Sequence, residues 1–149
     1  MARRKDQTTP MRFTQTAAPR GSETILLVDA DPETRKLAAF MLGKQGYTTI
    51  EARNRAEALV ELERAGSDIE LLLVDVKARG WELAEELRQT QPRLRVLFMC
   101  GDSGVGARVV MEQGLPFLRK PFTMAQIAGK VRSTLDVPVE KVMTAGSYL

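Results

Sequence analysis

The 149-residue chain contains no histidine, and this absence excludes several kinds of chemistry. Without an imidazole the chain cannot assemble a Ser-His-Asp hydrolase triad, and it cannot donate a phosphoryl group from a phosphohistidine. Its single cysteine, Cys100, cannot form an intrachain disulfide, and one thiol without histidine leaves no zinc cluster. We therefore expect a protein of the reducing cytoplasm that receives any phosphoryl group it handles from another molecule.

Long apolar runs are also missing. No stretch approaches the roughly 18 apolar residues of a membrane-spanning helix, and the basic N-terminus lacks the apolar segment of a signal peptide. We therefore expect neither secretion nor a membrane partner. The composition, 44% apolar and 28% charged, is that of a folded globular protein, and the length suits one domain.

Positive charge is concentrated at the N-terminus. Residues 1–22 carry five basic side chains against one acid, whereas the whole chain has a net charge of +3, so the remainder is slightly acidic. These residues show no hydrophobic period, and we expect a flexible basic arm. Because the arm and not the domain makes the protein basic, a nucleic-acid partner is not expected.

A strand-and-helix unit repeats five times between residues 23 and 136. "TILLVD" is rich in β formers, and the helix that follows has Asp31 as its N-cap, Pro32 at its first position and Gly46 at its end. The other units are "YTTIEA" with "NRAEALVELERAG", "IELLLVDV" with "WELAEELRQTQ", "LRVLFMC" with "GVGARVVMEQG", and "LPFLRK" with "TMAQIAGKVRSTL".

The near-continuous apolar strands predict a parallel sheet covered by helices on both faces. With right-handed crossovers this is a doubly wound α/β fold of the flavodoxin-like (βα)5 type, and we expect the strand order 2-1-3-4-5. Ligands of such sheets lie at the carboxyl ends of the strands, which places Asp29, Asp75, Cys100 and Lys120 at one edge. Residues 137–149 have no clear period, and we expect a loose tail there.

Four motifs occur in the order "ILLVDADP", "LLLVDV", "VLFMCGD" and "FLRKPF". In this order they resemble the receiver domain of two-component response regulators over residues 23–136, and they are most similar to the receivers of hybrid histidine kinases. The resemblance implies that Asp75 accepts a phosphoryl group from the phosphohistidine of a sensor histidine kinase or a phosphotransfer protein. No DNA-binding segment follows, so we expect a protein as the output target.

The resemblance also assigns roles to the neighbours of Asp75. Asp29, Asp75 and the backbone carbonyl of Lys77 would hold a magnesium ion, and Lys120 would contact the phosphoryl oxygens. A cis peptide bond before Pro121 would aim this lysine into the pocket. The physical reason is that transfer brings an anionic phosphoryl group up to a carboxylate, so positive charge must neutralise the pair.

The acidic pocket departs from the family pattern. Ala30 stands where the family usually has a second acid, so the side chain that would most directly bind the metal has no oxygen. We therefore expect a degenerate pocket with weak magnesium binding. Asp31 could reach back to the metal, although helix capping is its favoured role.

Two positions that act as the switch in the family are ambiguous as well. Cys100 stands where the family has Ser or Thr, and packing as a small hydrophobe is favoured over redox sensing. Phe117 corresponds to the aromatic side chain that changes rotamer in switching receivers, but core packing would explain it equally well.

The loop after Asp75 reads "DVKARGWEL" and is shorter than in the family pattern. Lys77 and Arg79 could supply positive charge that partly replaces the metal, but a solvated loop with Trp81 covering the core is the favoured interpretation. The glycines of "GDSGVG" lower helix propensity by about 1 kcal/mol each. The fourth helix should therefore be short or mobile.

Two functions stay open at this point. One is a single-domain receiver that is phosphorylated on Asp75 and signals through protein contact. The other is a pseudo-receiver that docks to its partner independently of phosphorylation. The sequence does not decide whether the protein forms a homodimer. An enzyme is not expected beyond self-dephosphorylation, because no Gly-rich phosphate-binding loop follows the first strand.

Overall fold

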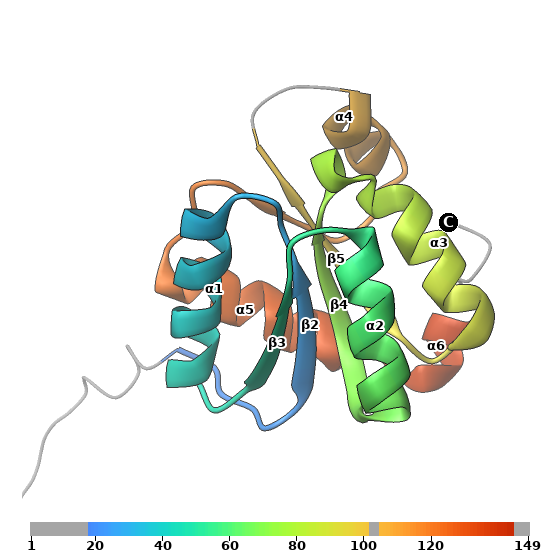
Figure 1. Ribbon diagram of the computed structural model, residues 1–149. Helices are drawn as coiled ribbons and strands as arrows, with labels where there is room; N and C mark the ends of the chain where they lie inside the picture. Colours follow the sequence, from blue (N-terminus) through green and yellow to red (C-terminus); the bar gives the residue numbers. More distant parts are fainter. Residues whose placement is uncertain (1–17, 102–104, 145–149) are drawn as a thin grey trace, which may run out of the picture.

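The computed structural model describes residues 18–101 and 105–144. The five strands of these residues form a parallel sheet in the order β3-β2-β4-β5-β6 (Figure 1). Counted along the chain this is the order 2-1-3-4-5, so the predicted flavodoxin-like fold is confirmed. The strands are β2 (Thr24–Val28), β3 (Thr48–Ala52), β4 (Ile69–Asp75), β5 (Arg95–Cys100) and β6 (Phe117–Arg119).

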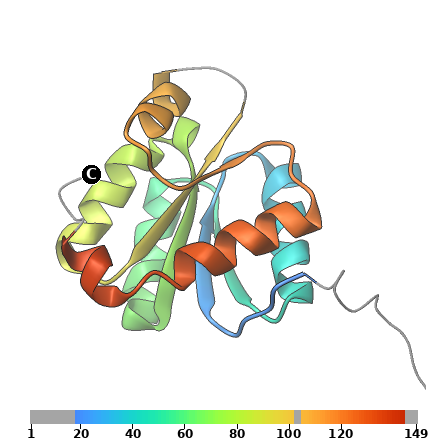
Figure 2. The ribbon, with the colours of Figure 1, turned by 180° about the vertical axis from the view of Figure 1, so that it is seen from behind.

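Helices cover both faces of the sheet (Figures 1 and 2). Side chains of β2 show how the faces divide: Ile25 and Leu27 join a buried cluster with α1 and α5, whereas Leu26 and Val28 join one with α2, α3 and α4. Successive side chains of a strand point to opposite faces, so one strand supplies both clusters. The helices are α1 (Pro32–Lys44), α2 (Arg55–Ala65), α3 (Gly80–Thr90), α4 (Val105–Glu112), α5 (Met124–Leu135) and α6 (Val139–Thr144), with the 3-10 turns η3 (Gly66–Asp68) and η4 (Val76–Ala78).

Helix starts follow the polar residues that precede them. Asp31 accepts a hydrogen bond from the Thr34 amide at 3.3 Å at the start of α1, and Asn54 accepts one from Glu57 at 2.9 Å at the start of α2. Thr123 begins α5 with a reciprocal capping box. The fourth helix is short, as predicted, since α4 has eight residues. No helix in the described part of the chain is long and apolar enough to span a bilayer.

The C-terminal segment corrects one expectation. Within the expected tail, residues 139–144 form helix α6 and the Val142 side chain is buried, whereas residues 145–149 lie outside the described residues. The Arg88 guanidinium donates to the Val142 carbonyl at 2.5 Å, and the Arg95 guanidinium donates to the Val137 carbonyl at 2.6 Å. Sequence periodicity could not reveal this helix, because its docking depends on arginines from α3 and β5.

The N-terminal arm needs a similar correction at its inner end. The Gly21 amide donates to the Gln45 carbonyl at 3.0 Å, and the Arg20 guanidinium donates to the Lys44 carbonyl at 3.2 Å. These residues therefore lie against the domain, beside the end of α1. Residues 1–17 of the expected flexible arm lie outside the described residues.

Candidate functional site

Two acids come together at the carboxyl edge of the sheet. β2 and β4 are adjacent parallel strands that pair Val28 with Val74, so Asp29 and Asp75 follow at the same level. Both are buried, with Asp29 1% exposed and Asp75 6% exposed. Two neighbouring buried carboxylates are costly unless a positive group and hydrogen bonds compensate them.

Lys120 supplies that positive group. Its Nζ atom donates to Asp29 Oδ2 at 2.7 Å and to Asp75 Oδ2 at 2.6 Å. The backbone amide of Lys120 donates to the Cys100 carbonyl at 2.8 Å, which ties the lysine to the end of β5. The peptide bond between Lys120 and Pro121 is cis. The structure thus brings together three of the side chains that the sequence placed at this edge.

Backbone amides bind the remaining oxygen of each acid. Asp29 Oδ1 accepts from the Asp31 amide at 2.9 Å, and Asp75 Oδ1 accepts from the Lys77 amide at 2.9 Å. Each carboxylate therefore holds one amide and shares the ammonium group of Lys120. Burial lowers the pKa of Lys120, but its hydrogen bonds to Asp29 and Asp75 outweigh this and raise the pKa above the ordinary lysine value. Lys120 is therefore positively charged at neutral pH.

A buried arginine that was not predicted from the sequence binds the backbone of Asp29. Arg35 of α1 donates from Nη1 to the Asp29 backbone carbonyl at 2.8 Å and from Nε to Glu51 Oε1 on β3 at 3.0 Å. Its side chain is 8% exposed. The available signal was its spacing, because Arg35 shares the inward face of α1 with Ala38 and Leu42.

Cys100 and Phe117 lie beside this edge in different settings. Cys100 is buried in the cluster that faces α2, α3 and α4, and burial together with the negative charge of Asp75 raises the pKa of its thiol. A neutral, buried thiol agrees with the packing interpretation. Phe117 is half-buried on β6, with the Lys130 ammonium 5.9 Å from its ring centroid.

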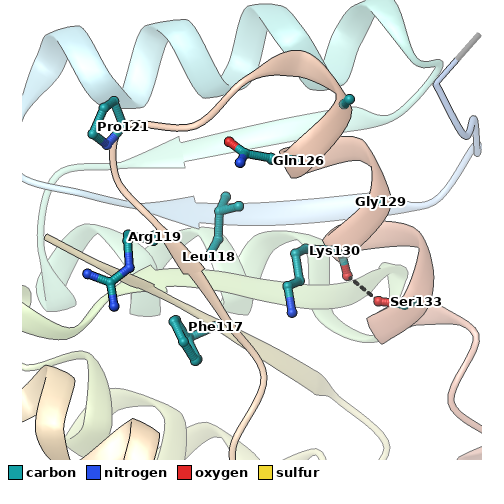
Figure 3. A pocket seen from close by; sticks show the side chains of 9 residues that line it. Phe117, Leu118, Arg119, Pro121, Gln126, Gly129, Lys130 and Ser133 are labelled. Carbon is teal, nitrogen blue, oxygen red and sulfur yellow. Dashed lines mark hydrogen bonds between the residues drawn. The ribbon is translucent and has the colours of Figure 1, made fainter. Parts of the chain in front are cut away.

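Phe117 also lines a groove between β6 and α5. The groove has a volume of about 510 Å³, and its walls include Leu118, Pro121, Gln126 and Lys130. Figure 3 shows the Phe117 ring and the Lys130 side chain at this groove. Pro121 of this lining directly follows Lys120 in the chain, although Asp29, Asp75 and Lys120 do not themselves line the groove.

The shortened loop after Asp75 makes a close turn with little free space beside its backbone. It passes through η4 to Arg79, which adopts a left-handed conformation with φ 56°, and then to Gly80 at the start of α3. A Cβ atom on Gly80 would lie 2.5 Å from the Asp75 carbonyl oxygen, so this position requires glycine. Trp81 stacks on Phe98 with ring centroids 5.6 Å apart, which agrees with a role in covering the core.

The side chains at this edge fit a magnesium ion poorly. Magnesium keeps several waters in its octahedral shell but needs carboxylate ligands from the protein, and here Ala30 provides no side-chain oxygen while Lys120 binds Oδ2 of both Asp29 and Asp75. Asp31 caps α1 and accepts from the Thr34 hydroxyl at 2.6 Å, in line with its favoured role. Among the residues that the structure describes, no group of three or more acid, cysteine or histidine side chains could hold a metal.

The fold and the edge together define a class of protein. A (βα)5 sheet with two buried acids after its first and third strands, and a lysine after its fifth, has the arrangement of a receiver. The model of the response regulator receiver domain matches residues 25–132, and the chain belongs to this family. The predicted membership is thereby confirmed.

Comparisons with individual proteins agree with this family membership. The chain is 31% identical over 121 residues to the sensor kinase CckA of Brucella abortus, with 78% of this chain and 13% of the kinase covered. A crystal structure of the receiver domain of the hybrid histidine kinase CckA is 29% identical and matches with a TM-score of 0.62, covering 76% of this chain and 99% of the other. The similarity to a hybrid-kinase receiver was predicted and is confirmed.

A second solved structure shows the fold alone. The CheY-like receiver domain protein of Methanospirillum hungatei JF-1 is 24% identical, with a TM-score of 0.68 over 81% of this chain and 98% of the other. The chain spans much less of its full-length curated relatives, 48% in the case of the transcriptional regulatory protein CpxR of Klebsiella pneumoniae. Receivers of this family take part in two-component signalling, and they generally accept a phosphoryl group and interact with histidine kinases or phosphotransfer proteins.

Proposed function

We propose that this receiver accepts a phosphoryl group on Asp75 and signals through protein contact. The observation that carries this proposal is the position of the Asp75 carboxylate. It lies at the carboxyl end of β4, on the edge where ligands of this fold bind, with the Lys120 ammonium 2.6 Å away.

The chemistry assigned to the chain's own residues is limited. An Asp75 oxygen attacks the phosphorus of a partner's phosphohistidine, an O–P bond forms and the N–P bond breaks. The imidazole leaves with its electron pair and takes up a proton. Lys120 and the Lys77 amide stand beside Asp75 and offset the negative charge that the phosphoryl group brings. Hydrolysis of the acyl phosphate would be the only further reaction.

A sensor histidine kinase or a phosphotransfer protein is the proposed donor. Helix α1 begins three residues after Asp29 and exposes two large apolar side chains, Leu37 at 48% and Phe40 at 62%. Such side chains on a helix beside the acid pair would suit the apolar face of a partner. The groove at Phe117 is the proposed output surface, since its lining starts at Pro121, next to Lys120.

A second function, the phosphorylation-independent docking module, is favoured by one specific observation. Asp75 and Asp29 already share a buried ammonium group, and Ala30 removes the acid that would recruit a metal. A receiver whose acid pair is compensated in this way can dock to a partner protein without any phosphoryl transfer. The two functions differ in whether Asp75 responds to a phosphoryl mimic.

Beryllium fluoride, which mimics a phosphoryl group on a carboxylate, provides the test. Trp81 is the only tryptophan and follows the loop that begins at Asp75, so its fluorescence should change saturably as the mimic is added. We expect the change to be lost in Asp75→Asn and to be absent with fluoride alone. A flat signal in the unmodified protein, both with magnesium chloride and with EDTA, would favour the docking module. Circular dichroism of the variant checks that it is folded.

A further inference from the structure

We propose that the acid pair of this receiver functions without a bound divalent cation, because the ammonium group of Lys120 holds the place between Asp29 and Asp75. The inference rests on the proposed function only for the phosphoryl chemistry. The statement about metal binding concerns the resting pocket and can be tested by itself.

The first argument is the position of the Lys120 ammonium group. Asp29 and Asp75 present four carboxylate oxygens, and each of them accepts a hydrogen bond of 2.6 to 2.9 Å from Lys120 or from a backbone amide. A magnesium ion that bridged the two acids would have to approach their oxygens to about 2.0–2.1 Å, and it would compete with the Lys120 ammonium group, which already joins the two Oδ2 atoms. No side-chain oxygen of residue 30 offsets this competition, because alanine has none.

The second argument is charge. Two carboxylates and one ammonium group leave the pocket with a net charge of −1, whereas a second acid at position 30 would make it −2. A dication gains less electrostatic energy from such a pocket and still loses its hydration shell.

The third argument is that the missing acid could be accommodated. Ala30 is exposed, so a longer side chain at this position meets no packed core. It lies directly after Asp29, whose side chain is held by Lys120 and by the Asp31 amide. Ala30→Asp should therefore restore the third carboxylate at the sheet edge without unfolding the domain.

The experiment titrates magnesium chloride at constant ionic strength, with calorimetric heat and melting temperature as readouts. The unmodified protein and Ala30→Asn, a neutral variant of the same size, should give no saturable binding. Ala30→Asp should bind magnesium at least about tenfold more tightly than either protein, which corresponds to about 1.4 kcal/mol of added binding free energy. Saturable binding by the unmodified protein that is lost in Asp29→Asn would overturn the proposal.

A second variant tests the role of Lys120. Lys120→Met leaves the two acids without their cation, so its melting temperature should fall and magnesium should restore part of the loss. The unmodified protein should show no such rescue. Equal stabilisation of both proteins by magnesium would contradict the inference.

The metal titrations use no phosphoryl donor, so they are independent of the proposed function. A protein that ignores both magnesium and beryllium fluoride would end the phosphoacceptor proposal and leave the present inference standing. A response to beryllium fluoride in the presence of EDTA would support both. A response that appears only with magnesium would support phosphorylation and overturn the present inference.

Discussion

Individual basic side chains fix the ends of several strands in this domain. Lys120 partly compensates the negative charge of an acid pair that would otherwise be unfavourable inside the protein, and Arg35 joins the backbone of Asp29 to Glu51. Arg132 does the same at the opposite end of the sheet, where it binds Glu23 at 2.7 Å. In each case an arginine or lysine from a helix or a loop fixes the end of a strand.

The pair between Glu23 and Arg132 predicts a specific pH dependence. The Arg132 hydrogen bond lowers the pKa of Glu23 below its ordinary value of 4.5, although burial opposes this. A lowered pKa in the folded state contributes stability above the ordinary pKa and loses it as the pH falls through the folded pKa. Glu23→Gln should therefore lower the free energy of unfolding by about 1 kcal/mol at neutral pH, and the difference should shrink below pH 4.5.

Urea denaturation at a series of pH values measures this difference. Glu86→Gln is the matched control, because Glu86 pairs with Arg55 on the surface, where the two side chains are 43% and 50% exposed. That substitution should change stability little at any pH. A Glu23→Gln effect that stays constant into the acid range would contradict the assignment.

At the scale of elements, the turn between β4 and α3 is the most constrained connection near the site. Gly80→Ala should cost about 1–3 kcal/mol of stability, because its Cβ atom would overlap backbone and force a shift. The Asp75 carbonyl oxygen stands 2.5 Å from that atom. Chemical denaturation measures the loss.

The control for this prediction is another glycine. Gly129 lies inside α5, and a Cβ atom there would meet nothing within 4 Å. Gly129→Ala should therefore be neutral or stabilise the protein by up to about 1 kcal/mol. If the two substitutions had equal effects, the close approach at Gly80 would not be the cause.

The elements were predictable wherever local pattern determined them. Apolar strands, the Asp31 cap and parallel pairing were enough to place Asp29 and Asp75 at one level and to bring Lys120 to the same edge. The Arg35 contact was not predictable, because it depends on the distance between α1 and β3 in the folded chain. Nor was the left-handed Arg79, since the conformation of a shortened loop depends on what it must connect.

At the scale of the whole molecule, the C-terminal segment contributes to stability. A chain that ends at Asp136 loses the buried Val142 side chain and the carbonyls that bind Arg88 and Arg95. We expect a loss of about 2–4 kcal/mol, from lost burial together with the lost hydrogen bonds. Thermal and urea unfolding of the truncated protein measure it.

The acid pair and its lysine lie far apart along the chain, since Lys120 is 91 residues from Asp29 and 45 from Asp75. During synthesis on the ribosome both acids emerge well before their counter-ion. Until Lys120 follows, alignment of the first four strands leaves the two acids without their counter-ion, and burying them in that state would be unfavourable. The pocket is therefore completed late in the maturation of the chain, when the last strand brings Lys120 to the two acids and reduces the negative charge of this edge.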